Sequence, residues 1–145
     1  MTFGRWLFVA LAGLLALSPA FAQGTAPKDP GSSKPNYWGA ISFTADGSYA
    51  TSWKKASKGE AEGDAAVRCA KFGRGSCETG AFDGETCVGL ATYIGSHSRR
   101  RWKLSYTAGS PTSSGAQQRA LERCNEDKRT RGRCQLRTVV CADGR

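Results

Sequence analysis

The residues best equipped for chemistry in this sequence are the arginines and lysines of its second half. Residues 98–104 read Ser-Arg-Arg-Arg-Trp-Lys-Leu. On a strand, successive side chains point to opposite faces, so Arg99, Arg101 and Lys103 would share one face at intervals of about 6–7 Å. The residues between them take the other face, where Trp102 becomes a core side chain. Such a row of cations predicts a surface that binds anions.

A second basic segment, Lys-Arg-Thr-Arg-Gly-Arg at 128–133, adds Arg129, Arg131 and Arg133 to this candidate surface. A guanidinium group presents a planar fork of donors that binds carboxylate or phosphate with two hydrogen bonds. We therefore expect an acidic protein or an anionic envelope polymer as the partner, and the export predicted from the N-terminus disfavours nucleic acid. One alternative stays open, because charged edge strands also keep sheets from pairing with one another.

The sequence offers little for catalysis. His97 is the one histidine, which excludes a multi-histidine site, and we expect it in a surface turn over residues 95–97. Asp83 and Glu85 flank Gly84 and are expected in a solvated turn rather than as the carboxylate pair of a glycosidase. No serine-hydrolase elbow, phosphate loop or His-Glu-x-x-His motif is present. We expect a non-enzymatic protein without metal or cofactor; the alternative is a small secreted hydrolase, a nuclease or a wall-active enzyme.

The aromatic residues are a further candidate, because Tyr37, Trp38, Trp53 and Trp102 could form a platform for sugars. Three of the four lie in segments with apolar neighbours. We therefore expect them to pack in the core, with Tyr37 the most exposed of the four.

The positive charge is concentrated in one half of the chain. The 145 residues carry 21 Lys+Arg and 12 Asp+Glu, and the net charge is +9. Residues 23–87 hold eight basic and eight acidic side chains, whereas residues 88–145 hold twelve basic and four acidic ones. An apolar fraction of 39% and a charged fraction of 23% exclude a collagen-like, coiled-coil or wholly disordered chain. Recognition of anions is therefore expected in the second half.

A duplicated scaffold must position these side chains. Trp-Gly-Ala-Ile-Ser-Phe at 38–43 resembles Val-Gly-Leu-Ala-Thr-Tyr at 88–93, at an offset of 50 residues. Four small or apolar residues spaced as one helical face end in Cys69, and the same spacing recurs 55 residues later and ends in Cys124. Cys69, Cys77 and Cys87 correspond in order to Cys124, Cys134 and Cys141, so duplication is the better explanation.

Each unit is expected to contain two strands, a helix and a third strand. The predicted elements are residues 38–43, 49–53, 58–70 and 76–82 in the first unit, and residues 88–94, 100–106, 114–125 and 134–141 in the second. Two ββαβ units, 38–87 and 88–141, predict an α+β fold with a largely antiparallel sheet and two helices packed against it. The small residues on the helical faces predict close contact between helix and sheet.

The six cysteines are expected to form disulfides, because their number is even and the chain is small and exported. Six cysteines allow 15 pairings. The duplication predicts that each helix-end cysteine joins the strand that follows, as Cys69–Cys77 and Cys124–Cys134. Cys87–Cys141 would then bridge the two halves.

The N-terminus predicts export. Residues 1–22 have the form of a bacterial secretory signal peptide, with Arg5, an apolar run and an Ala-Phe-Ala cleavage site. Cleavage would leave Gln23 first and no transmembrane anchor. Residues 23–36, rich in Pro, Gly, Ser and Lys, are expected to be a flexible leader, followed by a single domain over residues 37–145.

Several of these segments together resemble one family. They are the strand at 38–43, the Ser52-Trp53 pair, the alanine-rich helix ending in Cys69, and Cys-Val-Gly-Leu-Ala at 87–91. As a set they resemble the domain of unknown function 4189 family, small exported bacterial proteins, over residues 37–141. The resemblance implies export, this fold and the disulfides, and it assigns no catalytic residue. We therefore expect a binding protein of the periplasm or exterior, such as an inhibitor, an immunity factor or an envelope-interaction module.

Overall fold

The computed structural model describes residues 35–72 and 75–145. The predicted signal peptide, residues 1–22, and the predicted leader up to residue 34 lie outside the described residues. Among those described, no helix is long and apolar enough to cross a membrane.

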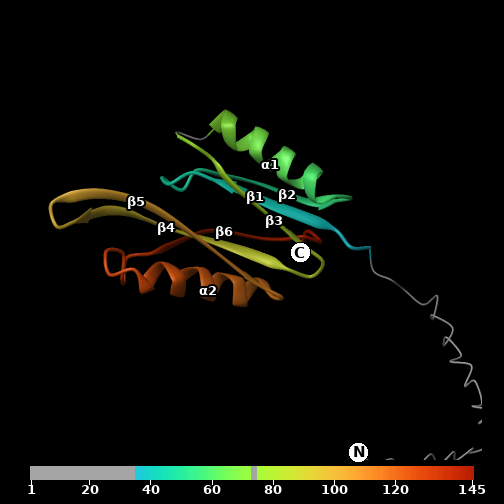
Figure 1. Ribbon diagram of the computed structural model, residues 1–145. Helices are drawn as coiled ribbons and strands as arrows, with labels where there is room; N and C mark the ends of the chain where they lie inside the picture. The colour runs from blue at the N-terminus through green and yellow to red at the C-terminus, as the bar shows by residue number, and fades with distance from the viewer. Residues whose placement is uncertain (1–34, 73–74) are drawn as a thin grey trace, which may run out of the picture. The chain divides into compact units, whose positions relative to one another are not determined.

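The first unit is a three-stranded antiparallel sheet covered by one helix (Figure 1). Its elements are β1 (Trp38–Phe43), β2 (Tyr49–Lys55), α1 (Lys58–Phe72) and β3 (Glu78–Asp83). The strand order is β2-β1-β3. The Ser57 hydroxyl accepts from the Glu60 amide, and the Glu60 carboxylate accepts from the Ala56 amide. The first bond satisfies a backbone donor that the start of α1 otherwise leaves unbonded, and the second ties the residue before Ser57 to the helix.

The second unit repeats this arrangement. Its elements are β4 (Cys87–His97), β5 (Arg100–Ser110), α2 (Ser113–Glu126) and β6 (Gln135–Cys141), with strand order β5-β4-β6. Thr112 caps α2, because its side chain accepts from the Gly115 amide. The predicted α+β fold of two ββαβ units is confirmed, and the antiparallel strands are divided between two sheets, one for each unit.

The two sheets face each other, and the helices cover their outer faces (Figure 1). Between the sheets lies a core cluster to which both units contribute, namely Ile41, Phe82, Leu90, Val140 and Ala142. Alanine forms the helix–sheet contacts: Ala61 and Ala65 pack on Ala40, and Ala120 packs on Ala91. The four-layer order follows because each sheet has apolar residues on both faces and must bury both.

Gly89 shows how closely the second helix approaches its sheet. A Cβ atom at this position would lie 2.5 Å from the carbonyl oxygen of Ala116 on α2. Gly39, its predicted counterpart at an offset of 50, instead faces the ring of Phe82 between the sheets. Ile41 and Leu90 occupy the same core layer, so the true offset of the first strands is 49. A shift of one residue moves every side chain to the other face of a strand, and the predicted alignment is wrong by that one residue.

All three predicted disulfides are present: Cys69–Cys77, Cys124–Cys134 and Cys87–Cys141. The third does not bridge the halves as expected. Cys87 is the first residue of β4 and pairs in register with Cys141 at the end of β6, so the bond joins two strands of the second sheet.

Candidate anion-binding site

The basic residues of the second unit lie on a hairpin that extends past the third strand of its sheet. β6 pairs with β4 only as far as Thr92↔Gln135, whereas β4 and β5 remain paired up to His97↔Arg100. Beyond residue 92 the hairpin is therefore two-stranded. Two-stranded hairpins are marginally stable by themselves, so this one must be supported by other parts of the chain.

The turn of the hairpin lies two to three residues later in the chain than predicted. Residues 95–97 belong to β4, and the turn consists of Ser98 and Arg99, with φ angles of 51° and 65°. Two successive residues at positive φ connect antiparallel strands with the twist that such strands prefer. Arg99 therefore lies in the turn and not on a strand face, whereas Arg101 and Lys103 do share one face, as the alternation predicted.

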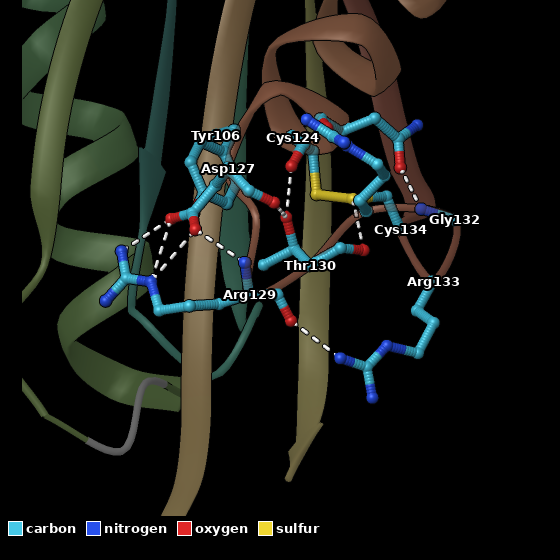
Figure 2. The surroundings of a disulfide bond; sticks show 10 residues. Tyr106, Cys124, Asp127, Arg129, Thr130, Gly132, Arg133 and Cys134 are labelled. Carbon is cyan, nitrogen blue, oxygen red and sulfur yellow. Dashed lines mark hydrogen bonds and ion pairs between the residues drawn. A yellow bond between two sulfur atoms is a disulfide. The ribbon is translucent and has the colours of Figure 1, made fainter. Parts of the chain in front are cut away.

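One side of the hairpin is supported by residues 127–133, called here the supporting loop (Figure 2). The guanidinium of Arg129 stacks 4.5 Å from the ring centroid of Trp102, and that of Arg133 lies 4.8 Å from the centroid of Tyr93. Arg133 also donates to the carbonyl oxygen of Ser96 at 3.1 Å. Cation–π contacts contribute about 0.5–2 kcal/mol each, depending on exposure, so the loop anchors both strands of the hairpin.

The supporting loop has a rigid interior. Thr130 is fully buried, and its hydroxyl donates to the carbonyl oxygens of Cys124 and Asp127. The side chain of Asn125 accepts from the Gly132 amide at 2.7 Å, and the Cys124–Cys134 disulfide closes the loop (Figure 2). These bonds hold the loop in one conformation against the hairpin.

Asp127 neutralises one of the predicted site residues. Its carboxylate accepts from the Arg129 side chain at 2.9 Å and from the Tyr106 hydroxyl at 2.7 Å. The hydrogen bonds from Arg129 hold the pKa of the Asp127 carboxyl well below its usual range. Burial, followed by the bond to Asp127, raises the pKa of Tyr106. Arg129 is thus a structural cation, and its charge is compensated within the loop.

The other side of the hairpin rests on the turn between β1 and β2. The Ser105 hydroxyl donates to the carbonyl oxygen of Thr44 at 2.9 Å, and Lys103 lies 4.0 Å from Asp46. Hydrogen bonds from the Thr44 hydroxyl and from Ser48 lower the pKa of Asp46 to about 2. Lys103, a predicted site residue, is therefore partly compensated as well.

The remaining cations of the hairpin are Arg99, Arg100 and Arg101, and all three are exposed. Among residues 35–72 and 75–145, no side-chain or backbone group lies within hydrogen-bond or ion-pair distance of the guanidinium groups of Arg99, Arg100 and Arg101. We call these three residues the arginine tip. Arg131 and Arg133 are also exposed and donate to carbonyl oxygens without losing their charge. The predicted set is thus divided between the tip and the loop that supports it.

Sequence reasoning missed Arg100 as a site residue. The alternation of side chains along the strand assigned Arg100 to the same face as Trp102, which is half-buried. Arg100 is the first residue of β5, however, and at this end of the strand its side chain is exposed. Its position immediately after the turn was the available signal. Asp127 was missed too, since no spacing rule connects it with Arg129 and Tyr106.

The residues considered for catalysis are His97, the last residue of β4, and Asp83 and Glu85, which lie at and after the end of β3. The carbonyl oxygen of His97 accepts from the Trp102 indole at 3.4 Å. Asp83 and Glu85 flank Gly84, whose φ is 61°, in the predicted turn.

The expectation that the four aromatic residues pack in the core, with Tyr37 the most exposed, was partly wrong. Trp53 is the exposed one, at 44%, whereas Tyr37 is half-buried. Trp102 and Trp38 pack at the edges of core clusters.

A comparison with family models connects this architecture to known sequences. The model described as Domain of unknown function (DUF4189) matches residues 38–141, from the first residue of β1 to the last residue of β6. The chain belongs to this family. Neither the curated proteins nor the solved structures contain a significant match. In this DUF4189 protein the matched segment spans both ββαβ units and all three disulfides.

Proposed function

We propose that this DUF4189 protein is an exported, non-enzymatic binding protein whose arginine tip recognises an anionic partner. The observation that carries the proposal is the set of three exposed arginines without a compensating carboxylate, at the end of a hairpin anchored on two sides. Because the hairpin is anchored, its backbone loses less conformational freedom on binding than a flexible loop would.

The partner is an acidic protein or an anionic polymer of the cell envelope. Both present carboxylates or phosphates in series, which match several guanidinium forks in one contact. Arg131 and Arg133, on the adjacent supporting loop, extend the positive surface beyond the tip. The partner is not nucleic acid in this proposal, because the protein acts outside the cytoplasm.

Export to the periplasm or exterior is supported by the cysteines. All six are in disulfides, and structural disulfides persist in oxidising compartments. The predicted signal peptide agrees with this location.

A charge-reversal comparison tests the proposal. Arg100→Glu/Arg101→Glu reverses two charges of the arginine tip, and Lys58→Glu/Lys71→Glu reverses two exposed charges on α1. Binding of a fluorescently labelled oligoglutamate peptide and of inorganic polyphosphate is measured by fluorescence anisotropy or competition. Both variants lower the net charge equally, so they separate a local site from a general charge effect.

We expect the tip variant to bind at least about tenfold more weakly, because each reversal replaces an attraction of about 1 kcal/mol at 4 Å in water by a repulsion. The α1 variant is expected to bind within about twofold of the unmodified protein, and affinity for both probes should fall with added salt. Oligoglutamate binding alone would indicate a protein partner, and polyphosphate binding alone a polymer. Equal losses in the two variants would overturn the proposal.

A further inference from the structure

The outer edge of β5 is closed in its second half and open in its first. β5 is the end strand in the order β5-β4-β6, so its outer edge pairs with no other strand of the described chain. In the second half, the carbonyl oxygen of Thr107 accepts from Arg123 at 3.0 Å, and that of Gly109 accepts from Arg119 at 3.2 Å. These two arginines of α2 therefore occupy acceptors that an added strand would need.

The same two bonds show which residues of the first half direct their backbone outward. In an antiparallel strand, alternate residues present their N–H and C=O groups to the same edge. β5 pairs with β4 without a register shift, so Arg101, Lys103 and Ser105 face outward as the two bonded residues do. Within the described part of the chain, no group bonds the backbone of these three residues at that edge. They therefore offer donors and acceptors to an incoming strand.

The open half coincides with the part of the hairpin that β6 does not reach. β6 pairs with β4 as far as Thr92, and the partner of Thr92 on β5 is Ser105. From there to the turn the hairpin has two strands, and a third strand is what a two-stranded hairpin needs for independent stability. An added strand on β5 would supply it exactly where β6 is missing. The open half, residues 100–105, has the length of an ordinary strand.

The side chains of the open half select the charge of an incoming strand. Arg101 and Lys103 share one face about 6–7 Å apart, and this face is uncovered, since Ile94 opposite Lys103 is 51% exposed. The Arg101 guanidinium has no ion-pair partner among the described residues, and the side chain of Lys103 is 56% exposed beside Asp46. Opposite charges across a strand pair stabilise it and like charges destabilise it. The edge therefore disfavours the same edge of a second copy and favours an acidic strand.

From this combination we infer that the open half of β5 binds an extended segment of an acidic protein, which adds to the second sheet as a further antiparallel strand. The inference rests on the proposed function and narrows its partner to a protein. Acidic residues at every second position of the segment lie opposite Arg101 and Lys103, and their backbone groups bond the open edge. Their carboxylates then have the spacing of the two cations. A polyphosphate chain has no N–H groups to complete such a ladder.

The test compares labelled peptides that contain glutamate and threonine in equal numbers. In one peptide the two residues alternate, and in a second all glutamates precede all threonines, so the charge is the same. Two further versions of the alternating peptide carry N-methyl groups, either on the glutamate amides, which would face β5, or on the threonine amides, which would face solvent. Binding to the oxidised mature protein is measured by fluorescence anisotropy. NMR measures hydrogen exchange of the amides of Arg101, Lys103 and Ser105.

We expect the alternating peptide to bind at least about tenfold more tightly than the block peptide, because only the alternating one combines ladder bonds with paired charges. N-methylation of the glutamate amides should abolish this advantage, and N-methylation of the threonine amides should preserve it. At saturation, exchange of the three amides should slow at least about tenfold.

A matched pair of protein variants tests the face. Arg101→Gln and Arg100→Gln each remove one charge of the arginine tip, but Arg100 directs its backbone to β4 and its side chain to the other face. Arg101→Gln should therefore weaken binding of the alternating peptide severalfold more than Arg100→Gln does. Thermal unfolding of both variants checks that they are folded.

Failure of this inference is distinguishable from failure of the proposed function. If oligoglutamate binds the arginine tip but the alternating and block peptides bind equally, or the three amides exchange as before, the added strand is refuted and the anion-binding tip remains. If no anionic probe binds at the tip, both are refuted. Tighter binding of polyphosphate than of the alternating peptide would point to a polymer, and concentration-dependent broadening of these amide signals in the free protein to a second copy; either result would also overturn the inference.

Discussion

Replacing Gly89 by alanine tests the close packing of α2 on the second sheet, which positions the supporting loop. The added Cβ would lie 2.5 Å from the carbonyl oxygen of Ala116 and 3.1 Å from the Cβ of Ala120. The helix would have to retreat by about 1 Å to restore an ordinary contact of 3.4 Å. Overpacking of this kind costs about 1–3 kcal/mol, and the reduced entropy of the unfolded chain returns about 0.4–1 kcal/mol. We therefore expect Gly89→Ala to lower the free energy of unfolding by about 1–2 kcal/mol.

The matched control is Gly80→Ala on β3, where an added Cβ meets no atom within 4 Å. That variant should be as stable as the unmodified protein or up to about 1 kcal/mol more stable. Urea unfolding of the oxidised proteins measures the difference, and thermal unfolding should separate the two variants by about 10 °C. If Gly89→Ala proves as stable as Gly80→Ala, the helix does not pack on this strand as closely as described.

Three further predictions concern the disulfides, the acid response and processing. In the chain-entropy account, removing the Cys87–Cys141 bond by double alanine substitution costs about 4 kcal/mol, against about 2.7 kcal/mol for Cys124–Cys134; urea unfolding gives both values, and the reverse order would contradict this reasoning. The pKa of Asp46, lowered from 3.8 to about 2, adds stability that is complete above about pH 4 and lost as the pH falls towards 2. Asp46→Asn should therefore flatten the acid-side loss of stability, and an unchanged pH profile would refute the assignment. Mass spectrometry of the exported protein should find Gln23 at the N-terminus, and retention of residues 1–22 would contradict the predicted cleavage.

The repeat is what made the fold and the disulfide pairs predictable. Cysteine order and helical spacing survive duplication, so they identified both helices and all three bonds. The alignment of the first strands was wrong by one residue, because Gly39 and Gly89 are alike in type but face a neighbouring ring and a helix backbone, respectively. Residue type does not reveal which partner requires a glycine.

The candidate site was predicted only in part, for two physical reasons. Side chains alternate between two faces only within a strand, and Arg99 lies outside both strands because the turn consists of residues 98 and 99. The compensation of Arg129 by Asp127 and its contact with Trp102 depend on tertiary proximity between a loop and a strand. Trp53 was expected in the core because its neighbours are apolar, but it lies near the end of β2, an edge strand of the first sheet, and is 44% exposed.

The most direct test of the account is an NMR titration of the oxidised, isotopically labelled protein with the oligoglutamate peptide, followed through the backbone amides. An arginine tip that binds anions predicts that the largest shift changes fall on residues 97–103, with smaller changes on the supporting loop and none on α1. The changes should weaken together as salt is added. Shift changes that are largest on the first unit, or that are absent at a saturating concentration of peptide, would contradict the central claim.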